Sequence, residues 1–218
     1  MTPRAPAADC TLCPRLARFR TENRTRFPAW HNAPVPSFGA IDARLLVVGL
    51  GPGLRGANRS GRPFTGDYAG DLLYATLAAH GFANDGFRAP REDAPWTGDE
   101  LVLHDARVTN AVRCVPPGNK PEPAEIRACN GFLNAELDAM PRLRVIVALG
   151  RVAHDAVLSA RGRRRGDAAF AHGALHDLGD GLSLVDSFHC SRYNTNTRRL
   201  TPEMFAAVFK RVRDLVDA

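Results

Sequence analysis

Three short apolar runs, each closed by glycine or by polar residues, restrict the fold of this chain more than any other feature of its sequence. They cover residues 45–48, 144–150 and 182–188 and consist mainly of valine, leucine and isoleucine. Runs of this length and composition are typical of buried strands. Residues 106–113 alternate between apolar and polar positions and predict a fourth strand.

The segments between these runs have the spacing of helices. Apolar residues recur at helical intervals within residues 72–80, 123–137, 152–160 and 201–216. Strands that alternate with helices predict an α/β fold of three layers, α/β/α, around a central, largely parallel sheet. We expect one domain over residues 1–218, with residues 1–44 as an irregular N-terminal arm and residues 83–100 as a surface excursion.

The composition is that of an ordinary globular protein with a mild basic excess. Of its 218 residues, 44% are hydrophobic and 24% charged, and 29 Lys and Arg against 23 Asp and Glu give a net charge of +6. Such an excess is compatible with nucleic-acid binding without requiring it. No apolar run reaches membrane-spanning length and the N-terminus has no signal core, so we expect a soluble, cytoplasmic monomer that has no membrane partner.

The glycine-rich loop over residues 49–67 follows the first predicted strand directly. Glycine lets backbone amides approach a bound group, and α/β proteins bind ligands where a strand ends in such a loop. The loop also carries three arginines, one phenylalanine and one acid: Arg55, Arg59, Arg62, Phe64 and Asp67. This mixture favours an anionic polymer with a flat ring as the ligand.

Four of the five cysteines have a spacing that indicates metal binding. Cys10 and Cys13 form one tight pair in the N-terminal arm, whereas Cys114 and Cys129 are far apart along the chain. Zinc knuckles usually have two tight pairs, so the pattern favours a [4Fe–4S] cluster, with zinc as the alternative. Cys190 lies in a different motif and is left out of the ligand set.

Four motifs in order carry a resemblance to a known family. They are Cys10-x2-Cys13, the loop from Gly49 to Asp67, Thr-Asn-Ala-Val-Arg-Cys-Val-Pro-Pro-Gly-Asn-Lys-Pro over residues 109–121, and His-Cys-Ser-Arg-Tyr-Asn over residues 189–194. Together they resemble the family 5 uracil-DNA glycosylases, the iron–sulfur, type B branch of that superfamily. The resemblance covers residues from about Cys10 to Thr201.

The resemblance implies a base-excision enzyme that flips a nucleotide out of DNA and hydrolyses its N-glycosidic bond, leaving an abasic site. It implies a stacking role for Phe64, recognition of the base edge by Asn110, and stabilisation of the departing base by His189. Asp67 would orient water or stabilise the sugar cation. Gly51 and Gly53 would make room for the substrate, and the DNA contacts would be Arg59, Arg62, Ser191, Arg192, Tyr193 and Asn194.

Two departures from the superfamily pattern affect these expectations. Residues 49–53 contain no acid where related uracil-specific enzymes have one, so the catalytic carboxylate falls to Asp67, which also precedes a predicted helix and is a candidate N-cap. Cys190 stands where proline is common. The absence of an acid after the strand predicts a roomier pocket, and hypoxanthine and xanthine join uracil as expected substrates.

Two other functions remain open at this level. A non-catalytic iron–sulfur DNA-binding module would keep the cysteines and the basic residues but would give Asp67 and His189 no task. A nucleotide-binding enzyme would use the glycine loop as a phosphate cradle, but the loop lacks Gly-Lys-Ser/Thr and is a poor dinucleotide fingerprint.

Overall fold

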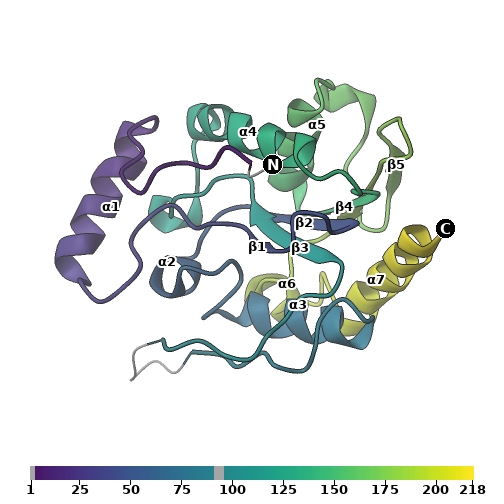
Figure 1. The fold of residues 1–218 in the computed structure, drawn as a ribbon, viewed down its shortest axis with the longest axis horizontal. Helices are drawn as coiled ribbons and strands as arrows, with labels where there is room; N and C mark the ends of the chain where they lie inside the picture. Colours follow the sequence, from purple (N-terminus) through teal and green to yellow (C-terminus); the bar gives the residue numbers. More distant parts are fainter. Residues whose placement is uncertain (1–2, 91–95) are drawn as a thin grey trace.

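A six-stranded sheet between two layers of helices forms the body of the molecule (Figure 1). The structure is a computed structural model that describes residues 3–90 and 96–218. The strands are β1 (Phe38–Gly39), β2 (Leu45–Gly49), β3 (Ala106–Asn110), β4 (Val145–Leu149), β5 (Leu175–Asp177) and β6 (Ser183–Ser187). The helices are α1 (Pro14–Arg26), α2 (Ala57–Ser60), α3 (Tyr68–Ala79), α4 (Pro123–Asp138), α5 (Arg151–Ala160), α6 (Arg192–Asn196) and α7 (Pro202–Asp217).

The sheet confirms the predicted α/β architecture. Its strand order is β1-β3-β2-β4-β6-β5, with the four inner strands parallel and both edge strands antiparallel. The inner strands are the four segments that the sequence predicts. The two edge strands were not predicted, because segments of two and three residues are too short to show a period.

Successive residues of the inner strands face opposite helix layers. Val47 and Val147 pack toward α3 and α7, whereas Leu46 and Ile146 pack toward α4 and α5. Figure 1 shows these two helix pairs on either side of the sheet. The inner strands β2 and β4 are buried on both faces, which explains why each is a continuous apolar run in the sequence.

The C-terminal helix starts where the sequence predicts. The Thr201 hydroxyl accepts the Met204 backbone N–H at 3.2 Å, and Pro202 occupies the first turn. None of the helices in the described ranges combines the length and the hydrophobicity that a bilayer crossing requires.

The expectation of an irregular arm over residues 1–44 was wrong for its centre, which forms α1. This helix buries only Leu16, Arg20 and Asn23, so it lacks the apolar stripe by which a helix is recognised in a sequence. The Arg15 guanidinium pairs with Glu125 on α4 at 2.7 and 2.8 Å. The arm therefore packs largely through polar contacts. Of the predicted excursion over 83–100, residues 91–95 lie outside the described residues.

A buried ionic group fixes β3 to α4. The Glu136 carboxylate, on a residue only 1% exposed, accepts from Arg107 at 2.7 Å, from Thr109 at 3.1 Å and from Arg113. Burial alone would raise the pKa of Glu136, but the two guanidinium groups hold it below its ordinary value. Arg113 is 4% exposed, which removes it from the arginines available to a phosphate backbone.

We predict that Glu136→Gln lowers the free energy of unfolding by about 3 kcal/mol, because it leaves two buried guanidinium groups without a countercharge. Urea denaturation at neutral pH measures this loss. The pKa of Glu136 is lowered in the folded state, so the stability that its carboxylate contributes is present at neutral pH and is lost as the pH falls through the folded-state pKa. The free energies of unfolding of the wild type and the variant are therefore expected to converge in acid. Asp138→Asn, which alters an exposed pair with Arg161, is the control. An equal loss in both variants would contradict the prediction.

Candidate active site

A cavity of about 650 Å³ opens at the carboxyl ends of the parallel strands. Residues that follow β2, β3, β4 and β6 line it, in the position where α/β folds bind ligands. The residues predicted from sequence to act in catalysis or to bind the substrate all line this one cavity: Gly51, Gly53, Phe64, Asp67, Asn110 and His189.

Phe64 and Asn110 meet above Gly49, the last residue of β2. A Cβ on Gly49 would lie 2.5 Å from the Phe64 ring and 2.5 Å from Asn110 Oδ1, so only glycine allows both to approach. Phe64 is 6% exposed, and its ring lies 5.9 Å from the His189 ring with 25° between the planes. The cavity thus has a flat aromatic wall beside a planar amide.

The Asp67 side chain lies in a recess that two glycines provide. A Cβ on Gly53 or Gly56 would come within 2.9 Å or 2.6 Å of Asp67 Oδ2. Asp67 occupies the N-cap position of α3 but makes no side-chain capping hydrogen bond. These glycines therefore make room for a carboxylate as well as for a ligand.

Asp67 is open to the cavity on one side and surrounded by protein on the others. This burial raises the pKa of Asp67, and the backbone amides of Gly70 and Ala69 offset part of the increase. A carboxylate in this setting can both accept a proton and stabilise a nearby positive charge.

His189 follows β6 and is held as a neutral imidazole. Burial lowers its pKa to about 4, because protonation would place an unpaired charge inside the protein. The preceding residue, Phe188, donates its backbone N–H to His172 Nδ1 at 3.2 Å, and the two rings stack. Asn194 Nδ2 donates to the His189 carbonyl at 2.8 Å. Asn194, predicted to contact DNA, thus also braces the loop of His189.

The other residues predicted to contact DNA lie in different settings. Ser191 caps α6 by accepting the Asn194 N–H, and Arg192 lies 5.5 Å over the Tyr68 ring at the cavity rim. Tyr193 is 73% exposed. Arg59 lies on α2 with its guanidinium over the Trp30 ring.

Arg62, which was predicted to contact DNA, lies in an ion pair within the protein. Its side chain is 13% exposed and forms an ion pair with Asp99, whose side chain is fully buried. Both terminal nitrogens are bound to that carboxylate, so the group that would meet a phosphate is already neutralised. Asp99 lies 37 residues further along the chain, so no local sequence pattern predicts this ion pair.

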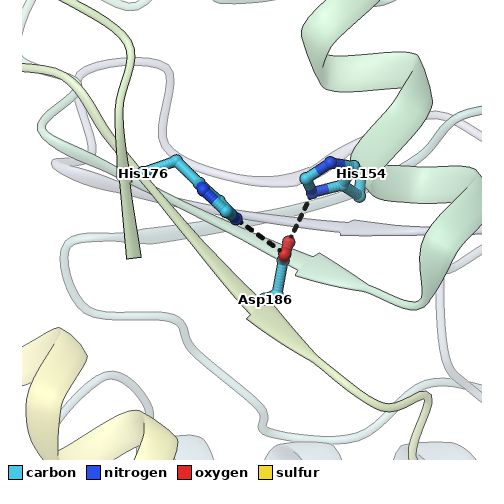
Figure 2. A group of neighbouring side chains, drawn as sticks. All are labelled: His154, His176 and Asp186. Atoms are coloured by element: carbon cyan, nitrogen blue, oxygen red, sulfur yellow. Dashed lines mark hydrogen bonds and ion pairs between the residues drawn. The ribbon is translucent and has the colours of Figure 1, made fainter. Parts of the chain in front are cut away.

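A second charged group, which the sequence analysis did not identify, joins β6 to α5 and β5 (Figure 2). Asp186 accepts from His154 Nδ1 at 2.7 Å and from His176 Nε2 at 2.9 Å, and His154 Nε2 bonds the Ala168 carbonyl at 3.1 Å. Burial opposes a charge on His154, but the Asp186 carboxylate raises its pKa above the ordinary value. These are direct hydrogen-bond lengths, which leave no space for an ion between the groups. The only signal in the sequence was a lone acid within an apolar strand.

The four cysteines assigned to a cluster line one small cavity between α1, α4 and the end of β3. Arg20 reaches into it and donates to Cys114 Sγ at 3.6 Å, and the Arg113 backbone N–H donates to Cys129 Sγ at 3.3 Å. Arg20 Nε is buried with no hydrogen-bond partner among the described residues. Cys190 packs instead in the core beside α3, where its thiol donates to the Ala69 carbonyl at 3.4 Å.

Comparisons with known proteins agree with the resemblance drawn from the motifs. The family model of the uracil DNA glycosylase superfamily matches residues 36–213. A type-5 uracil-DNA glycosylase of Thermus thermophilus is 45% identical over 212 residues, covering 94% of this chain and 93% of that protein. Type-5 uracil-DNA glycosylases of Mycobacterium bovis and Pyrobaculum aerophilum are 40% and 38% identical, over 94% and 93% of this chain and 78% and 87% of theirs.

We predict that the His189 ring stays neutral down to pH 5.5, because its pKa in the folded protein is about 4. Nitrogen-15 NMR of the imidazole, assigned with a His189→Asn variant, measures this directly. In the urea-unfolded chain the same ring titrates near pH 6.5. The depressed pKa means that neutral His189 contributes stability above about pH 6.5, and that this is lost as the pH falls toward the folded value. A folded-state midpoint above pH 6 would contradict the prediction.

Proposed function

The chain belongs to the uracil-DNA glycosylase superfamily and to its type-5 branch, and we propose that it hydrolyses the N-glycosidic bond of uracil in DNA, leaving an abasic site. The observation that carries the proposal is the single cavity shared by a carboxylate, a neutral imidazole, an amide and an aromatic wall. A non-catalytic module would not need the glycines that shape the space around Asp67. One chain supplies all of these groups, so the site does not need a second copy, and we propose that the protein acts as a monomer.

Recognition of the base begins when the nucleotide leaves the helix. The Phe64 ring offers a plane for stacking, since it forms part of the cavity wall. The Asn110 amide presents a donor and an acceptor, the pattern needed to pair with the edge of uracil. Asn110 is 3% exposed at the end of β3, so its amide is held in place by the sheet.

Cleavage separates charge at two places. The bond between the sugar C1′ and the base nitrogen breaks, its electron pair moves into the base, and positive charge develops on the sugar. Neutral His189 donates a hydrogen bond to the base oxygen on which negative charge gathers. The Asp67 carboxylate stabilises the sugar cation and orients a water that adds to C1′, and the water's proton passes to that carboxylate.

The raised pKa of Asp67 suits this second task. Burial makes the carboxylate a stronger base than a solvated one, while its exposure to the cavity keeps it in reach of water. The pKa of His189 is lowered by the same cause, because burial favours the neutral form of an imidazole as it does of a carboxyl group. Neutral His189 can donate a hydrogen bond without bringing a second charge into the cavity.

The cavity also favours substrates larger than uracil. Its volume of about 650 Å³ is not reduced by an acidic side chain in residues 49–53. We therefore include hypoxanthine and xanthine, two deaminated purines, among the proposed substrates. Tyr193, which is 73% exposed beside the cavity, is our candidate to fill the gap left by the flipped nucleotide, with Ser191, Arg192 and Arg59 near the DNA backbone.

We predict that Asp67→Asn lowers the single-turnover rate of uracil excision by at least about 100-fold, because the sugar cation loses its countercharge. The assay incubates a duplex containing one uracil without nucleotide cofactors and cleaves abasic sites with alkali. Asp214→Asn, which changes an exposed carboxylate on α7 outside the cavity lining, is the control and keeps the wild-type rate.

The same assay tests each part of the proposal. Wild-type protein that yields no product at uracil contradicts the function, and an Asp67→Asn variant with near-full activity contradicts the role of the carboxylate. Duplexes with hypoxanthine or xanthine in place of uracil test the substrate range, and a product confined to uracil removes the purines.

We also propose that Cys10, Cys13, Cys114 and Cys129 hold a [4Fe–4S] cluster. The buried, unpartnered Arg20 Nε would find an acceptor in an inorganic sulfide. A tetrahedral zinc site brings its sulfurs within about 3.8 Å of one another, given Zn–S bonds of about 2.3 Å. Among the described residues, His154, His176 and Asp186 form a set of three ligand atoms within 4.8 Å, whereas the cysteine sulfurs form none. A four-iron body, which spreads its ligands further apart, fits better.

The cluster's proposed chemistry is structural. Two ligands come from the arm and two from the core, so a bound cluster would join α1 to the end of β3 and to α4. No step of the excision reaction requires it.

We predict that Cys114→Ser lowers the iron and acid-labile sulfide content of the purified protein to near zero and removes its visible absorbance. Elemental analysis and absorption spectroscopy provide the measurement. Cys190→Ala is the control and keeps both, because that thiol is on the opposite face of the sheet. A colourless wild-type protein that contains zinc would contradict the assignment.

A further inference from the structure

Each of the three nitrogens of the Arg62 guanidinium donates a hydrogen bond within the protein. Nη1 and Nη2 donate to the two Asp99 oxygens at 2.6 and 2.7 Å, and Nε donates to Thr65 Oγ1 at 2.8 Å. This paired geometry is the strongest that an arginine and a carboxylate can form. Because the Asp99 side chain is fully buried, the pair is held away from competing water.

Aromatic rings enclose the same guanidinium. Its central carbon lies 5.1 to 5.8 Å from the ring centroids of Phe38, Tyr74, Phe87 and Trp96. A cation within about 6 Å of a ring centroid is attracted to the face of the ring. These rings come from separate segments of the chain, so Arg62 is a point at which β1, α3 and the 83–100 excursion converge.

The excursion holds Asp99 ready for this contact. Asp99 accepts the Arg88 backbone N–H at 2.9 Å and the Leu101 N–H at 3.1 Å in addition to Arg62. Burial would raise the pKa of Asp99, but Arg62 and these two amides hold it below its ordinary value. The carboxylate is therefore charged and oriented at neutral pH by its own segment.

Phe64 lies between the two residues that this arrangement fixes. Its φ is +52°, a left-handed backbone conformation that is strained for a bulky side chain. On one side Arg62 is held by Asp99, and on the other Thr65 is held by Arg62 Nε. Between them, the Pro63 carbonyl accepts the Tyr74 hydroxyl at 2.6 Å. The backbone of Phe64 thus keeps its unusual conformation because its neighbours are tied down.

We propose that Arg62 and Asp99 are positioning residues that hold the Phe64 ring plane in the cavity wall at the angle required for stacking on the flipped base. The proposal rests on the proposed excision function. It gives the 83–100 excursion a part in substrate binding, although no described residue of that excursion lines the cavity.

A double-mutant cycle tests the proposal in the full-length protein. Asp99→Asn is expected to lower the single-turnover excision rate about 10- to 100-fold, the effect of a small displacement of a positioned group. In a Phe64→Leu background, where no aromatic plane remains to be positioned, Asp99→Asn is expected to change the rate less than about twofold. A general loss of structure would lower the rate in both backgrounds.

Asp105→Asn is the matched control. It breaks another partly buried pair, in which Arg44 Nε and Asp105 Oδ2 lie 2.5 Å apart at the amino end of β2, away from the cavity. Its melting temperature is expected to fall, while its excision rate stays at the wild-type value in both backgrounds. Should Asp99→Asn not fold, Arg62→Lys replaces it, because lysine keeps the charge and loses the paired geometry.

The outcomes separate this inference from the function itself. Wild-type protein without excision activity overturns the proposed function. Active wild-type protein together with an Asp99→Asn variant of equal rate overturns the positioning role. The positioning role is also overturned if Asp99→Asn lowers the single-turnover excision rate by the same factor in the wild-type and the Phe64→Leu backgrounds.

Discussion

The pairing of Gly49 with Asn110 across β2 and β3 is the constraint from which the rest of the cavity follows. Because the strands are parallel and in register, both residues reach the carboxyl edge of the sheet at the same level. The missing side chain of Gly49 leaves the space in which the Asn110 amide and the Phe64 ring come together. A shift of β3 by one residue would turn the Asn110 side chain to the opposite helix layer. The sheet register therefore fixes the chemistry of the site.

Buried charged groups connect the sheet to its neighbouring elements outside the cavity. Glu136 joins Arg107 and Arg113 between β3 and α4, and the Asp186 carboxylate joins two histidines beneath α5. Buried pairs of this kind contribute little net stability but are costly to break on one side. They join β3 to α4 and β6 to α5 and β5. Part of the basic excess of the chain thus acts inside the fold, and the net charge of +6 overstates the arginines available to DNA.

The sequence was informative wherever burial imposed a period. The inner strands, α3, α4, α5 and α7 all present apolar faces to the core, and the sequence predicted each of them. The helix α1 was missed because two of its three buried residues, Arg20 and Asn23, are polar. Arg20 donates to the Cys10 carbonyl and to Cys114 Sγ, contacts that no local pattern predicts. The candidate site was found through motifs, and all its predicted substrate-side residues share the cavity. The ion pair of Arg62 was not predicted, because its partner, Asp99, is distant in sequence and only the fold brings the two together.

The space beside Asp67 has a consequence for how variation in this loop would be detected. A methyl group at Gly53 would meet only the end of the Asp67 side chain within 4 Å, and that end can move into the cavity. The backbone and the core would be undisturbed, so expression, solubility and melting temperature would all look normal. A screen that measures stability would therefore not detect a substitution at Gly53, and only a measurement of turnover would show that displacing the Asp67 carboxylate lowers activity.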